Sequence, residues 1–167
     1  MILIVDDRIE NIISLKHFLE LNKFEVDTAS SGEEALKKVL KNDYALIILD
    51  VQMPDMDGFE VAENLSGYSK TKNIPIIFLS AVNIEKKFIT RGYQSGGIDY
   101  VTKPFDPDIL LLKVKTFYKL YEQTRELNII QENLRNEIAE RILAEEKLSE
   151  KITELHTTLN SISEIAF

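Results

Sequence analysis

The chain of 167 residues contains no cysteine, which excludes disulfide bonds, thiolate metal sites and cysteine nucleophiles. No apolar run approaches the roughly 20 residues that a membrane-spanning helix needs, and the apolar start Met1–Val5 is too short for a signal peptide. Basic residues are few, since 20 Lys and Arg face 28 Asp and Glu, which gives a formal net charge of −8. That balance argues against direct nucleic-acid binding, because neutralising phosphates takes a basic surface. We therefore expect a cytoplasmic protein with no membrane span.

Glycine and proline are confined to the first part of the chain. All six glycines and all four prolines lie at or before Pro107, and residues 108–167 contain neither. Because glycine and proline turn chains and end helices, the first part is expected to be a compact domain. The remainder is expected to be uninterrupted helix from Asp108 onward.

Short apolar runs alternate with segments of helical spacing in the first part. Five runs are predicted as strands, the last two being weaker candidates: Ile2–Val5, Ala45–Leu49, Ile76–Leu79, Glu25–Ala29 and Ile98–Val101. Four segments are predicted as helices: Ile9–Leu21, Glu33–Leu40, Phe59–Leu65 and Ile84–Tyr93. This alternation predicts an α/β fold, in which right-handed crossovers build a five-stranded parallel sheet that helices cover on both faces.

Chemically active side chains gather where the predicted strands end. Asp6 and Asp7 follow the first strand, Asp50 the third, Ser80 and Ala81 end the fourth, and Lys103 follows the fifth. A parallel sheet brings these ends to one edge, where ligands of such sheets bind. Crowded carboxylates repel one another unless a cation compensates, and an all-oxygen ligand set favours Mg²⁺. With a lysine and a hydroxyl close by, the set predicts phosphoryl transfer to Asp50.

Four motifs together resemble the receiver domain of two-component response regulators over about residues 1–120. They are Ile4-Val5-Asp6-Asp7, the segment Leu49–Gly58 (LDVQMPDMDG), Leu79-Ser80-Ala81, and the segment Gly96–Phe105 (GGIDYVTKPF). The resemblance implies a flavodoxin-like (CheY-like), doubly wound sheet with strand order 2-1-3-4-5. It also implies that Asp50 accepts a phosphoryl group from a phosphohistidine on a partner histidine kinase.

The resemblance further implies a role for each matching residue. Mg²⁺ would be held by Asp7 directly, by Asp6 mostly through water, by Asp50, and by the backbone carbonyl of Gln52. Lys103, joined to Pro104 by a cis peptide bond, would pair with the phosphoryl oxygens. Ser80 and Ala81 belong to the phosphoryl-binding strand end, and Tyr100 would swing inward when Ser80 moves. This exchange would shift the face formed by the fourth helix, the fifth strand and the fifth helix.

The last part of the chain carries a coiled-coil pattern that extends the fifth helix. Its apolar seam follows 3-4 spacing and comprises Leu120, Leu127, Leu134, Ile138, Leu148, Ile152, Leu155, Leu159 and Ile162. Leucine at d positions and isoleucine at a positions favour a parallel two-stranded coil, so we expect a parallel homodimer. Arg141 and Glu145 interrupt the seam, and either they pair across the dimer or the seam shifts register there.

We therefore expect a receiver domain at residues 1–118 and a coiled-coil linker at 119–167, truncated before an output domain. The expected function is phosphorelay signalling, with no enzyme activity beyond the phosphorylation and dephosphorylation of the chain itself. The alternative is a fragment of a larger histidine kinase, diguanylate cyclase or protein phosphatase. A flavin-binding protein is disfavoured because Asp6-Asp7-Arg8 replaces a phosphate-binding loop, and an aspartyl phosphatase because Gln52 replaces its second acid.

Overall fold

The computed structural model describes residues 1–81 and 99–165, with the backbone alone described at 162–165. Its elements, in chain order, are β1 (Ile2–Val5), α1 (Ile9–Leu21), β2 (Val26–Ala29), α2 (Gly32–Lys41), β3 (Leu46–Asp50), α3 (Gly58–Ser66), β4 (Ile76–Ala81), β5 (Asp99–Lys103) and α5 (Pro107–Ile165). The helix predicted at Ile84–Tyr93 lies outside the described residues, as do the first residues of the GGIDYVTKPF motif.

The five strands form one parallel sheet in the order β2-β1-β3-β4-β5, which confirms the predicted topology. The central strands β1 and β3 are buried along their whole length, because helices cover both of their faces. Their continuous runs of Ile, Leu and Val suit such double burial. In the register of the sheet, Val5 lies beside Leu49 of β3, and Asp50 lies beside Leu79 of β4. The carboxyl ends of β1, β3 and β4 therefore meet at one edge.

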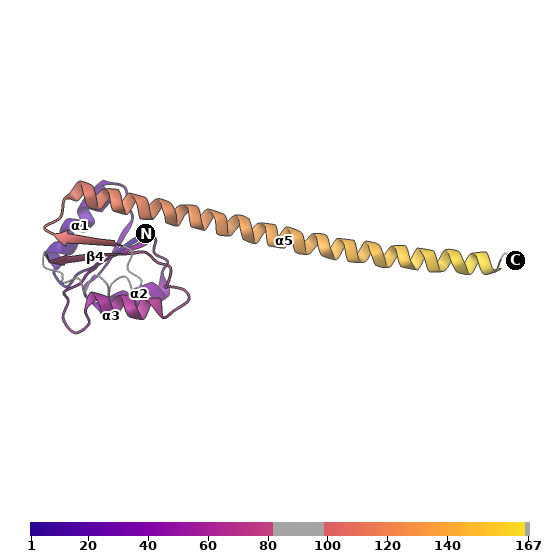
Figure 1. Ribbon diagram of the computed structural model, residues 1–167, viewed down its shortest axis with the longest axis horizontal. Helices are drawn as coiled ribbons and strands as arrows, with labels where there is room; N and C mark the ends of the chain where they lie inside the picture. Colours follow the sequence, from indigo (N-terminus) through magenta and orange to yellow (C-terminus); the bar gives the residue numbers. More distant parts are fainter. Residues whose placement is uncertain (82–98, 166–167) are drawn as a thin grey trace. The chain divides into compact units, whose positions relative to one another are not determined.

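Two apolar clusters pack on opposite faces of the sheet, and Figure 1 shows the helices that cover each face. On one face, α2 and α3 contribute residues such as Val39 and Phe59. On the other face, Leu15 and Leu19 of α1 pack with Leu110 and Val114 from the beginning of α5. Both layers hold the sheet in a fixed position, so the side chains at its carboxyl edge project from a rigid support.

Capping residues decide where the helices begin. The Ser31 hydroxyl accepts a hydrogen bond from the Glu34 N–H and starts α2, one residue before the predicted start. Asp57 and Glu60 form a reciprocal capping box at the start of α3. Pro107 is the first residue of α5, a position where its missing N–H is not needed.

The fifth strand extends beyond its prediction at the carboxyl end, and Ile98 at its predicted start lies outside the described residues. We expected Ile98–Val101 followed by a loop, whereas β5 runs from Asp99 to Lys103. The reason is that β4 continues to Ala81, so that Ser80 and Ala81 lie opposite Thr102 and Lys103. Lys103 is thus held by the sheet itself instead of lying in a free loop.

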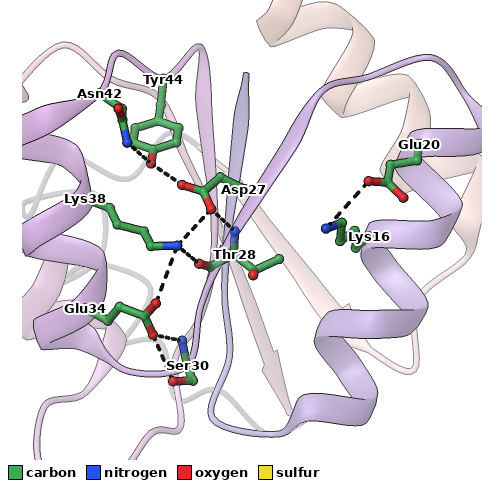
Figure 2. Close-up of polar contacts among 9 residues, drawn as sticks. All are labelled: Lys16, Glu20, Asp27, Thr28, Ser30, Glu34, Lys38, Asn42 and Tyr44. Carbon is green, nitrogen blue, oxygen red and sulfur yellow. Dashed lines mark hydrogen bonds and ion pairs between the residues drawn. The ribbon is translucent and has the colours of Figure 1, made fainter.

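A polar network ties the edge strand β2 to α2, as Figure 2 shows. Lys38 Nζ lies 2.8 Å from Asp27 Oδ1 and donates to the Thr28 carbonyl at 2.6 Å, and the Tyr44 hydroxyl donates to Asp27 Oδ2 at 2.6 Å. Burial raises the pKa of the Asp27 carboxyl, but the bonds from Lys38, Tyr44 and the Thr28 N–H outweigh it and the net shift is downward. The same surroundings raise the pKa of Tyr44 to about 12, through burial and the bond to Asp27. The network therefore favours a charged Asp27 and a neutral Tyr44.

The chain divides into two units, Met1–Glu122 and Gln123–Phe167. The second unit is the helical continuation of α5, and every side chain described in it, up to Ser161, is exposed. None of the described helices is sufficiently long and apolar to cross a membrane.

Candidate functional site

Two aspartates and one lysine meet at the carboxyl edge of the sheet. Asp6 follows β1, Asp50 ends β3 and Lys103 ends β5. Lys103 Nζ lies 3.0 Å from Asp6 Oδ2 and 3.0 Å from Asp50 Oδ1. Asp50 and Lys103 follow Asp6 by 44 and 97 positions in the sequence. The three residues nevertheless form one charged cluster, as their places at the strand ends predicted.

Asp6 is the most buried member of this cluster, with 1% of its surface exposed. Asn11 Nδ2 lies 3.0 Å from each of its carboxylate oxygens, and the Arg8 N–H donates to Oδ1 at 2.9 Å. These donors compensate for much of the hydration that Asp6 loses. Sequence reasoning missed Asn11, although a polar residue in the first turn of a helix that follows a strand-end aspartate is a usable signal.

Asp50 is 5% exposed, and its surroundings disfavour its charge. Burial raises the pKa of Asp50, and the neighbouring charge of Asp6 adds to the rise. Hydrogen bonds from Lys103 and from the Gln52 N–H oppose the shift without cancelling it. Burial lowers the pKa of Lys103, but its ion pairs with Asp50 and Asp6 prevail and the net shift is upward. In this cluster the charged form of Asp50 is therefore disfavoured, whereas the charged form of Lys103 is favoured.

The third predicted acid, Asp7, is exposed at the rim of the site. One carboxylate oxygen from each of Asp6, Asp7 and Asp50 lies within 4.8 Å of the others. Three carboxylates beside one lysine leave an excess of negative charge at one point. Such an arrangement attracts a small cation with a preference for oxygen ligands.

The predicted switch residues lie on β4 and β5, the strands that follow Asp50 and lead to Lys103. Ser80 is buried, and its Oγ has no hydrogen-bond partner among the residues that the structure describes, whereas Ala81 is exposed. The Tyr100 ring stacks on Phe78 at a centroid distance of 5.1 Å. The Lys103-Pro104 peptide bond is cis, as expected. A buried hydroxyl without a partner is costly, so Ser80 is a group prepared to bind something that the described residues do not supply.

Glycine at position 58 allows the loop after β3 to fold back on Asp50. A Cβ on Gly58 would lie 2.3 Å from the Asp50 carbonyl oxygen and 3.0 Å from Val51 Cα. The Gly58 N–H also donates to the Val51 carbonyl at 3.0 Å. Close backbone contact therefore fixes the main chain on which the Asp50 side chain is mounted.

A family model for the response regulator receiver domain matches residues 2–115. The chain belongs to this receiver family. The match spans all five strands of the sheet and every residue of the charged cluster. The resemblance seen in the four sequence motifs is thereby confirmed.

Known receivers with similar sequences occur in proteins of different kinds. The transcriptional regulatory protein SrrA of Staphylococcus aureus is 41% identical over 123 residues, which cover 74% of this chain and 49% of SrrA. The chain thus matches about half the length of this curated relative. The chemotaxis protein CheY4 of Vibrio cholerae is 34% identical with a TM-score of 0.66, covering 70% of this chain and 96% of that one. The receiver domain of a histidine kinase from Syntrophus aciditrophicus is 32% identical with a TM-score of 0.65, covering 71% and 89%.

The residues at the receiver site fit a magnesium ion. Asp6, Asp7 and Asp50 offer hard oxygen ligands from one side, and no histidine or cysteine lies in their cluster. The carbonyl of Gln52, expected as a further ligand, belongs to an exposed residue whose N–H already contacts Asp50. The Ser80 hydroxyl, which has no hydrogen-bond partner among the described residues, adds a hydrogen-bond donor on β4, the strand beside the one that Asp50 ends.

Two further features of the receiver were not predicted from the sequence. A cavity of about 400 Å³ opens beside Asp6 and Lys103, and apolar residues such as Leu15, Phe18 and Phe105 make up most of the remaining lining. In addition, Lys113 of α5 pairs with Asp99 at the start of β5. The first feature offers an apolar surface next to the charged cluster. The second joins the strand of Tyr100 and Lys103 to the helix that leads into the second unit.

Proposed function

We propose that this chain is a phosphorylation switch in which Asp50 accepts a phosphoryl group from a phosphohistidine on a partner histidine kinase. The observation that carries the proposal is the position of Asp50, buried at 5% exposure, 3.0 Å from Lys103 and beside two further acids. A structural ion pair would not need the extra acids, because each adds repulsion. An acceptor of a doubly charged phosphoryl group uses each of these parts.

The proposed step exchanges one bond at phosphorus for another. A carboxylate oxygen of Asp50 attacks the phosphorus, a new P–O bond forms, and the P–N bond to the histidine ring breaks with its electron pair leaving on nitrogen. Lys103 neutralises charge on the phosphoryl oxygens, and the Ser80 hydroxyl donates to one of them. Transfer removes Asp50 from its ion pair with Lys103 and gives Ser80 a hydrogen-bond partner, which it does not have among the described residues.

Asp6, Asp7, Asp50 and the Gln52 carbonyl are proposed to hold Mg²⁺ for this step. When bound, the ion supplies positive charge that lets two anions approach each other. Asn11 and the Arg8 N–H keep the Asp6 carboxylate in a fixed orientation, so this ligand is in place before the ion arrives.

The output of the switch is proposed to run through β5 and α5. Tyr100 and Lys103 lie on β5, and the Asp99–Lys113 pair connects this strand to α5. A movement of Ser80 and Ala81 toward the phosphoryl group would leave space for Tyr100 to move inward. We propose that residues 1–118 act as the receiver, that residues 119–167 act as a linker, and that the linker pairs two chains in parallel.

We propose a histidine kinase as the protein to which such a linker leads, with a diguanylate cyclase or protein phosphatase as alternatives. The similarity to the receiver of the Syntrophus aciditrophicus histidine kinase supports this choice. In each case any enzyme activity would belong to a part outside these 167 residues.

Acetyl phosphate with Mg²⁺ tests the phosphorylation site directly. Intact-mass measurement of the full chain should show the gain of one phosphoryl group, and Asp50→Asn should show none. Asp43→Asn is a matched control, since Asp43 is exposed and pairs with Lys70 away from the site. Phosphorylation of the Asp50→Asn chain, or none in the wild type, contradicts the proposal.

A second experiment separates the chemistry from kinase recognition. Ile9 and Ile13 of α1 are 58% and 60% exposed, and α1 begins two residues after Asp7, so they are available to a partner at this edge. Ile13→Glu should reduce phosphotransfer from a histidine kinase at least about tenfold, because it places a charge in an apolar contact. Its labelling by acetyl phosphate should stay unchanged, and equal loss with both donors would argue against recognition through α1.

A further inference from the structure

The second unit carries an apolar stripe that no described side chain covers. Leu127, Leu134, Ile138, Leu148, Ile152, Leu155 and Leu159 recur at 3-4 spacing along this helix, and each is 47–66% exposed. The stripe residues before Arg141 and those after Glu145 lie on the same side of the helix, because residues three or four apart share one helix face. The proposed parallel dimer covers the stripe with its counterpart on a second copy.

Two opposite charges lie in the middle of the stripe. Arg141 and Glu145 occupy the d and a positions between Ile138 and Leu148, and Arg141 Nε lies 3.3 Å from Glu145 Oε1 of the same helix. Both side chains are well exposed, at 80% and 68%, so their pairing within one helix adds little to helix stability. A pair intended only to support the helix would serve as well on its outer face, where it would not interrupt the apolar stripe.

We propose that Arg141 and Glu145 form a charge-balanced layer between two copies of the chain and fix the register of the coil. This inference rests on the proposed dimer. In a parallel coil, a side chain at d inserts among the a and d side chains of the facing helix. Arg141 of each copy then contacts Glu145 of the other, which gives two arginines and two glutamates in one layer with no net charge.

The layer discriminates against other registers of the same stripe. A slip of one heptad keeps one Arg–Glu contact but places the other glutamate among Leu148, Ile152 and Leu155 of the second copy. It also places the other arginine beside Gln131, Leu134 and Ile138. In the slipped register these charges lose hydration and keep only the partner on their own helix, so this register is disfavoured. Apolar layers alone would tolerate such a slip more readily.

A charge-reversal experiment on the full chain tests the layer. Arg141→Glu gives a chain with two acids in the layer, and Glu145→Arg gives a chain with two bases. Each alone should weaken homodimerisation at least about tenfold by sedimentation equilibrium, because four like charges then meet. An equimolar mixture should form heterodimers with wild-type affinity, and the double variant Arg141→Glu/Glu145→Arg should recover homodimerisation.

A matched pair of variants controls for net charge. Glu140 and Lys147 both occupy the outer c position and are exposed, so Lys147→Glu and Glu140→Arg change the charge in the same way outside the seam. Each of these should form homodimers as the wild type does, with no preference for heterodimers when mixed. Equal sorting by the outer pair would overturn the proposal, because it would attribute the effect to net charge.

The remaining outcomes separate this inference from the function on which it rests. If the two seam variants dimerise as the wild type does and do not sort, the layer does not join the copies, although the dimer stands. If the wild type itself is monomeric in the sedimentation experiment, the proposed dimer fails. The direction of pairing is read from a single Leu134→Cys variant, which is possible because the chain lacks cysteine. Oxidation should link Leu134→Cys chains in a parallel dimer, and no linkage would overturn the parallel register.

Discussion

The two units of this chain treat the same residue types in opposite ways. In the receiver unit, Ile, Leu and Val fill two packed layers, while acids are gathered at one edge of the sheet. In the helical unit the same apolar residues are exposed, and opposite charges alternate with them. The receiver unit therefore packs both of its apolar clusters internally but holds an electrostatic conflict at its site. The helical unit has little conflict among its charges, yet its apolar stripe is left uncovered. A conflict of charges and an uncovered surface are two different ways in which a fold can be made to respond to another molecule.

The largest difference should appear when one substitution is made in both units. Ile48→Ala should lower the free energy of unfolding of the receiver unit by about 2–5 kcal/mol, because Ile48 is fully buried. Ile152→Ala, at a residue that is 47% exposed, should change it by less than about 0.5 kcal/mol. Urea unfolding followed by tyrosine fluorescence reports the receiver unit alone, since all six tyrosines lie at or before Tyr121. A similar loss for both variants would mean that the units do not unfold independently.

Alkaline pH should weaken the receiver unit through Tyr44. Its folded pKa is raised to about 12, whereas an unfolded chain loses the tyrosine proton near pH 10. The folded state therefore holds the proton more tightly, and its advantage is complete below pH 10 and is lost as the pH rises toward 12. The free energy of unfolding should fall by up to about 2 kcal/mol over this range. Tyr44→Phe should remove that part of the fall, and an identical pH profile in the variant would refute the assignment.

The electrostatic conflict at the site should be visible as a gain in stability when Asp50 loses its charge. The pKa of Asp50 is raised in the folded state, so any stabilisation from its proton is lost as the pH rises through that folded pKa. At pH 7 the ionised carboxylate therefore costs stability, and Asp50→Asn in EDTA should be more stable by about 1 kcal/mol. Saturating Mg²⁺ should stabilise the wild type by about 1.4 kcal/mol at ten times its Kd and should leave the variant unchanged. A variant less stable than the wild type in EDTA would contradict this account.

The smallest effect is expected at an exposed ion pair of the receiver. Lys16 Nζ and Glu20 Oε1 are 3.7 Å apart with side chains 42% and 48% exposed (Figure 2), so Lys16→Gln should cost less than about 0.5 kcal/mol. Lys38→Gln removes the same charge but also breaks bonds to Asp27 and Thr28, and should cost about 1–2 kcal/mol. Thermal unfolding of both variants in low and high salt checks the comparison. Equal costs would show that the network around Lys38 contributes no more than a surface pair.

Much of the fold could be predicted because its signals are local. The apolar runs that became β1 and β3 are continuous, and the capping residues Ser31 and Asp57 precede their helices in the sequence. The site followed from topology, since the carboxyl ends of parallel strands share an edge and Asp6, Asp50 and Lys103 all lie at such ends. The carboxyl end of β5 was less predictable, because its last two residues are ordered by pairing with β4.

The contacts that the sequence did not reveal are those between distant elements. The position of Asn11 against Asp6 depends on how α1 leaves the strand, and the Asp99–Lys113 pair depends on how α5 packs beside β5. No periodicity encodes either contact. The apolar stripe of the second unit could be seen at once in the sequence, whereas the second copy proposed to cover it is another molecule.

The network at the edge of the sheet has a consequence for how this protein meets its own copies. On the side of β1, the backbone N–H groups of Ile2 and Asp6 donate to the carbonyls of Glu25 and Ala29. Thr28 lies between these two acceptors, and its backbone N–H and carbonyl point away from β1, toward the open edge of the sheet. Asp27 Oδ1 accepts a hydrogen bond from the Thr28 N–H at 2.8 Å, and Lys38 Nζ donates to the Thr28 carbonyl at 2.6 Å. An incoming strand would find both groups already engaged, which discourages growth of the sheet into a fibre. Crowding these molecules together should thus favour joining by helices over stacking by strands.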